Sequence, residues 1–154
     1  MRKYNVSYQR THDIDWFVRH DGKVYHFASN GGLLPDFIKC SQNRIVQHLI
    51  AKKEDKKGID INIHRENISD YFYIEEIGQL NEFLLSFIEM ARKGIISCDN
   101  VSDNPDSPIY RIIAEPYSDV NSSFGDSDIL ELIPEFDVGH LIWDNRSKEY
   151  GIAA

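Results

Sequence analysis

The dipeptide Asp21-Gly22 constrains the fold of this chain more than any other feature, because it separates two runs rich in β-forming residues, 13–20 and 23–29. An Asp-Gly pair at this position is a strong signal for a two-residue type I′ turn, in which both central residues need a positive φ. The sequence therefore predicts a β-hairpin near the N-terminus.

A two-residue loop also fixes which residues face each other across the hairpin. His20 is placed opposite Lys23, and counting back from the turn places Phe17 opposite His26. Side chains alternate between the faces of a strand. One face is predicted to be core and carries Trp16, Val18, Tyr25 and Phe27. The other face is mixed and is either half-buried or part of a site; it carries Asp15, Phe17, Arg19, Val24, His26 and Ala28.

Helical spacing of apolar residues predicts two main helices, over residues 42–53 and 75–93. Ser41 is the expected N-cap of the first, and Gly94 fits the left-handed position that follows the second. Further β-forming runs predict strands at 4–9, 59–63, 95–98 and 109–114, the last two forming a long-looped hairpin. The run 129–133 is compatible with a strand or a helix.

These elements do not alternate as strand, helix and strand, so they predict an α+β fold. We expect a single domain over residues 1–154. Its architecture should be one antiparallel sheet of about four to six strands packed against two main helices.

The distribution of apolar residues predicts a soluble, cytoplasmic protein with no membrane partner. Residues 1–13 are polar and contain no export signal, and glutamates interrupt the longest apolar-rich stretch, 74–91. Two cysteines far apart in the sequence, Cys40 and Cys98, favour a reducing compartment.

The charge of the chain is distributed unevenly. Residues 1–94 hold 14 Lys and Arg and 13 Asp and Glu, a net charge of +1, whereas residues 95–154 hold 3 and 12, a net charge of −9. Nucleic-acid binding requires positive potential, so this pattern argues against a nucleic-acid partner. It favours a basic protein as partner, since opposite charge attracts one.

The acidic stretch 99–137 also contains aromatic residues that could anchor a partner. The favoured interpretation is therefore a non-catalytic binding or regulatory domain, similar in its charge to inhibitors or immunity proteins that block a basic toxin or nuclease. Its predicted partner-binding residues are Tyr117, Asp119, Phe124, Asp126 and Asp128.

The alternative is a small hydrolase-type enzyme that uses the mixed face of the hairpin. Its candidate catalytic residues are Asp13, Asp15, Arg19 and His26. This interpretation requires the four side chains to converge in a concave pocket. A metal cluster of His26 with the two aspartates lacks any recognised ligand spacing, and 30–32 lacks the spacing of a phosphate-binding loop, so no metal and no cofactor is predicted.

Overall fold

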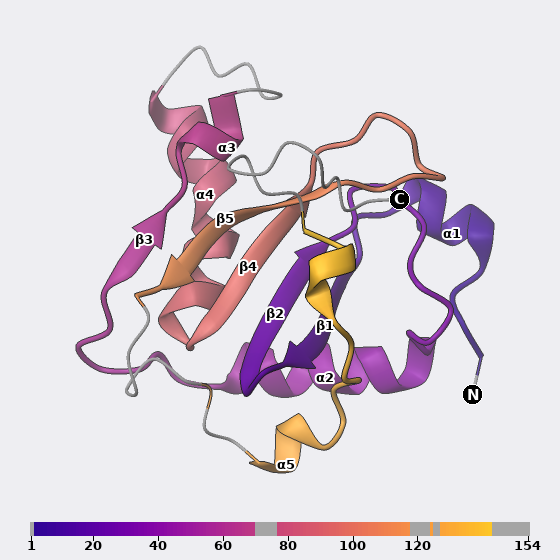
Figure 1. Cartoon of the computed structure of the whole chain (residues 1–154), viewed down its shortest axis with the longest axis horizontal. Helices are drawn as coiled ribbons and strands as arrows, with labels where there is room; N and C mark the ends of the chain where they lie inside the picture. Colours follow the sequence, from indigo (N-terminus) through magenta and orange to yellow (C-terminus); the bar gives the residue numbers. More distant parts are fainter. Residues whose placement is uncertain (1, 70–76, 118–123, 125–126, 143–154) are drawn as a thin grey trace.

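The computed structural model describes residues 2–69, 77–117, 124 and 127–142. Its centre is a five-stranded sheet with the order β1-β2-β4-β5-β3. Helices α2 and α4 lie behind the sheet in the view of Figure 1, and the segment after α5 crosses in front of β1 and β2. The described residues thus form an α+β fold around one sheet, as the sequence predicts.

The N-terminal hairpin consists of β1 (Asp15–His20) and β2 (Lys23–Ala28). The predicted register is confirmed, with His20 opposite Lys23 and Phe17 opposite His26. Both turn residues have a positive φ, 50° at Asp21 and 73° at Gly22, as a type I′ turn requires. This register fixes which end of the sheet holds Asp15.

A second antiparallel hairpin joins β4 (Ile95–Asn100) to β5 (Tyr110–Pro116), as the sequence predicts. The short strand β3 (Ile61–Ile63) pairs antiparallel with β5 and forms an outer edge of the sheet.

The expectation of a wholly antiparallel sheet is wrong at one pairing, because β2 and β4 run parallel. Residues 29–94, which contain α2 and α4, return the chain to the end of the sheet where β2 begins. A long connection of this kind is what a parallel pair needs.

The predicted strand at 4–9 is also wrong, because helix α1 (Val6–Thr11) forms there. The side-chain Oδ1 of Asn5 accepts hydrogen bonds from Ser7 N at 2.8 Å and from Tyr8 N at 3.3 Å. An asparagine N-cap satisfies backbone donors that a helix start would leave unpaired. Local capping therefore decides the conformation of this segment.

The two main helices are α2 (Cys40–Lys52) and α4 (Ile77–Arg92). The N-cap of α2 is Lys39 rather than the expected Ser41, which lies inside the helix. Gly94 follows α4 with a φ of 89°, as predicted. The shorter elements are α3 (Glu66–Ser69), α5 (Ser127–Leu130) and the 3₁₀ turn η1 (Val138–His140). Among the described helices, none has the length and apolar character needed to cross a membrane.

Both faces of the hairpin are buried. The predicted core face packs beneath the segment around Val138, and Trp16 there is stacked on Phe27 with a ring-centroid distance of 4.4 Å. The mixed face is covered by the helices: Phe17 packs with Val46 of α2. The hairpin face that was a candidate site is therefore mostly core, and it reaches the surface at Asp15 and at Arg19, toward opposite ends of β1.

Candidate functional site

Two hollows meet at Asp13 and Asp15, at the end of the sheet where β1 begins and β2 and β4 finish. The larger, called the strand-end cleft, has a volume of about 490 Å³. Its carboxylates are those of Asp13, Asp15, Asp99 and Asp103. The second hollow, of about 390 Å³, lies between α1 and α2 and includes Tyr8 and Arg44.

The sheet register explains how acids from distant parts of the sequence meet in the strand-end cleft. Asp15 pairs with Ala28 across the hairpin, and Ala28 pairs with Asp99 across the parallel β2–β4 contact. Asp103 follows in the loop after β4 and is exposed at the rim. The sequence alone does not predict this convergence, because it depends on the parallel pairing of β2 with β4.

Hydrogen bonds fix the loop segments that line the cleft. Asp13 Oδ1 accepts from Asn30 N at 2.9 Å. The buried Asn100 donates through Nδ2 to Ser29 O at 2.9 Å, and its Oδ1 accepts from Ser102 N at 3.0 Å. The cleft is therefore preformed rather than assembled from loose loops.

The glycines at 31 and 32 do not present free amides to an anion. Gly31 N donates to His12 O at 3.2 Å and Gly32 N donates to Ser29 O at 2.8 Å. Phosphate loops work by aiming such N–H groups at the ligand. Here both donors are used to turn the chain.

A hydrogen-bonded relay runs inward from the cleft through Asp15, His26 and Ser97. Asp15 Oδ1 is 2.7 Å from His26 Nε2, and Ser97 Oγ is 2.7 Å from His26 Nδ1. These residue types match a Ser-His-Asp triad. However, Ser97 is 0% exposed and His26 is 1% exposed, so no substrate reaches the hydroxyl. The relay joins three neighbouring strands inside the fold, β1, β2 and β4.

The predicted catalytic set does not converge. Arg19 lies toward the other end of β1, where its Nε donates to Ile133 O at 2.9 Å and its Nη1 contacts Glu135 Oε2 at 3.1 Å. Asp13 and Asp15 share the cleft, whereas His26 is sealed beneath it. The hydrolase interpretation therefore lacks the geometry that it required.

The predicted partner-binding residues divide into three groups. Phe124 is only 3% exposed and lies under Lys53, whose Nζ is 4.7 Å from the ring centroid, so its assignment as a surface anchor is wrong. Tyr117 is 56% exposed, and Asp128 is exposed on α5. Asp119 and Asp126 lie outside the described residues.

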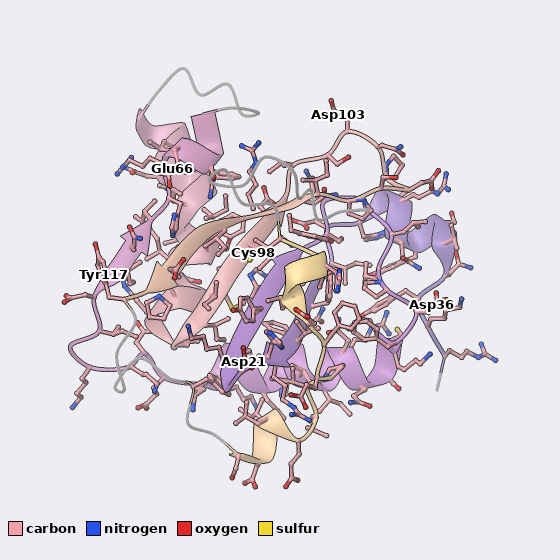
Figure 2. All side chains as sticks on the ribbon, viewed as in Figure 1. Asp21, Asp36, Glu66, Cys98, Asp103 and Tyr117 are labelled. Atoms are coloured by element: carbon pink, nitrogen blue, oxygen red, sulfur yellow. The ribbon has the colours of Figure 1, made fainter. Side chains whose placement is uncertain are left out.

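The described acids of the final third are split between the two ends of the sheet. Asp103 lies at the opposite side of the molecule from Asp21 at the hairpin turn (Figure 2). Near that turn, Glu135 pairs with Arg19 at 3.1 Å, and Asp137 lies 3.6 Å from the His20 ring. The described acids of 99–137 therefore lie in two regions of different character rather than on one surface.

No cysteine or metal site accompanies the cleft within the described ranges. Cys98 is buried, and desolvation holds the pKa of its thiol well above the usual value, so it stays protonated. Among residues 2–69, 77–117 and 127–142, no group of three or more His, Cys, Asp or Glu side chains is arranged to hold a metal ion.

Comparison of the chain with models of known families, with curated proteins and with solved structures finds no match. Inference about function therefore depends on the geometry of the strand-end cleft.

Proposed function

We propose that this chain is a binding domain for a basic protein, which inserts a lysine or arginine side chain into the strand-end cleft. One observation carries this proposal: four carboxylates line a hollow of about 490 Å³, and no Lys, Arg or His is among its lining residues in the described part of the chain. Charge of one sign in a concave site focuses its potential on an incoming ion of the opposite sign.

The rest of the lining fits the shape of a basic side chain. Phe83 and Phe87 of α4 form an apolar wall, with their ring centroids 5.3 Å apart. Lysine and arginine have an apolar stem and a charged head, so the stem suits this wall and the head suits the carboxylates. The Asp15 side chain is 50% exposed and is available to such a head group.

The cleft is the better of the two acidic regions because the region near the hairpin turn already contains cations. Arg19 and His20 contact Glu135 and Asp137 there. In the cleft, the Asp15 carboxylate contacts His26 at 2.7 Å, but that ring is sealed beneath the cleft and half of the Asp15 side chain stays exposed. The proposal keeps the basic partner that the charge pattern predicts and moves the contact from 117–128 to the cleft.

The test is a ¹⁵N-¹H NMR titration with a short amidated peptide that contains Arg and Lys. We expect saturable shifts at the amides of Asp13, Asp15 and Asp103. The variant Asp103→Lys should weaken binding about fivefold, the size expected for one rim charge pair. Raising the salt from about 0.1 M to 1 M should weaken it further, because the screening length falls from about 10 Å to 3 Å.

The matched control is Asp55→Lys, which makes the same charge change at an exposed residue outside the cleft lining. It should leave the peptide affinity near that of the wild type. Equal losses in both variants would show a general charge effect rather than a site, and shifts spread evenly over all exposed acids would contradict the proposal.

A further inference from the structure

His64 is held between two carboxylates at the outer edge of the sheet, directly after β3. Its Nε2 is 2.8 Å from Glu115 Oε2 on β5, and its Nδ1 is 3.1 Å from Glu66 Oε1 on α3. The His64 side chain is 22% exposed and that of Glu115 is 26% exposed, so water competes only partly for this contact. One ring thus links three elements.

The geometry determines the protonation state of the ring. Ionised carboxylates only accept hydrogen bonds, and a neutral imidazole has a single N–H, so it can donate to one of them but not to both. Two carboxylate partners therefore require the imidazolium form. The hydrogen bond to Glu115 is the largest effect and raises the pKa of His64 from its usual 6.5, burial opposes this, and Glu66 adds to the rise.

We propose that His64 is a proton-controlled clamp that ties β3 and α3 to β5, and that loss of its proton loosens this edge of the sheet. The clamp adds to the other ties of this edge, which include the short β3–β5 ladder, the hydrogen bond from His64 N to Ile113 O at 2.8 Å and that from Asn67 Nδ2 of α3 to Ile112 O at 2.8 Å. Because β3 is the outermost strand, the clamp controls access to the backbone of β5 (Figure 1).

The groups around the His64 ring come from β5, α3, β3 and α4, and the charge that changes with pH in this proposal is the one on His64. In the described residues, the charged groups that act on it are Glu115 of β5 and Glu66 of α3. From β3, Asn62 Nδ2 lies 3.4 Å from the ring. From α4, the residues that pack with Ile61 and Ile63 are apolar, among them Leu80 and Phe83.

The direction of the effect follows from the raised pKa. A histidine with a folded-state pKa above its unfolded value contributes stability fully below about pH 6.5, and this contribution is lost as the pH rises through the folded-state pKa. We therefore expect β3 and α3 to be held firmly on β5 in mildly acidic solution, and less firmly as the pH rises through the folded-state pKa of His64.

Two measurements on the whole chain test the clamp. Ring ¹⁵N shifts of His64 should show both nitrogens protonated at pH 6.5. The second measurement is the hydrogen-exchange protection factor of the His64 amide, which removes the intrinsic pH dependence of exchange. We expect this protection factor to fall about twofold to fivefold as the pH rises, which is the size expected for partly exposed ion pairs. That amide donates to Ile113 O at 2.8 Å.

The variant His64→Gln should abolish the pH dependence of this protection, and the control His48→Gln, at an exposed histidine of α2, should retain it. A single protonated ring nitrogen in the wild type at pH 6.5 would overturn the inference. A decline in protection with pH that is as large in His64→Gln as in the wild type would also overturn the inference. If that variant does not fold, the ring shifts of the wild type decide alone.

Discussion

Removing the hydroxyl of Ser97 should destabilise the protein measurably, because this group is the inner partner of a sealed histidine. In Ser97→Ala, His26 Nδ1 loses the hydroxyl that lies 2.7 Å away. Ser97 is 0% exposed and His26 is 1% exposed, so water cannot replace that hydroxyl. A buried polar group left without a partner costs about 1–3 kcal/mol, and we expect about 2 kcal/mol here.

The outer partner of the same histidine should matter less. In Asp15→Asn the side-chain oxygen can still accept from His26 Nε2, and half of the side chain is exposed to water. We expect a loss below about 1 kcal/mol. The control Ser41→Ala removes an exposed hydroxyl on α2 and should stay within about 0.5 kcal/mol of the wild type.

Urea unfolding followed by tryptophan fluorescence provides the assay, since Trp16 is fully buried. With a slope of about 1–3 kcal/mol/M, a loss of about 2 kcal/mol moves the midpoint by roughly 1 M. A larger loss in Asp15→Asn than in Ser97→Ala would refute the reasoning, because it would mean that the exposed end of the relay carries the stability.

Two further variants test the packing around the cleft and the start of the chain. In Gly32→Ala, the new Cβ would lie 2.6 Å from Asn100 Nδ2 and 3.1 Å from Ser29 O, so we expect a loss of about 1–3 kcal/mol in the same urea assay; a loss below about 0.5 kcal/mol would show that the loop yields freely. In Asn5→Ala, the cap of α1 is lost at a cost of about 1 kcal/mol, and hydrogen exchange at Ser7 and Tyr8 should accelerate, whereas Asn5→Asp should keep the protection.

The hairpin could be predicted to the residue because its determinants are local. A two-residue turn with positive φ at Asp21 and Gly22 leaves one register, and the opposition of Phe17 and His26 follows from it. The helix at Val6–Thr11 had a local signal too, since Asn5 is a good N-cap, but the β-forming residues of 4–9 outweighed it in the prediction.

The candidate site could be predicted only in part because it depends on pairings between distant segments. Asp13 and Asp15 were identified near the start of β1, but Asp99 joins them only through the parallel contact of β2 with β4. Phe124 illustrates the same limit: an aromatic residue in a polar stretch has no local mark that distinguishes burial under Lys53 from exposure.

The parallel contact of β2 with β4 also governs how the molecule forms. Each antiparallel hairpin can assemble from neighbouring residues, but the central contact must wait until the chain between Ala28 and Ile95 closes into a long loop. Closing such a loop is slow compared with forming a hairpin, so joining the two hairpins should limit the folding rate. Until that moment the acids of β1 and β4 belong to separate pieces, and the cleft appears only in the last step.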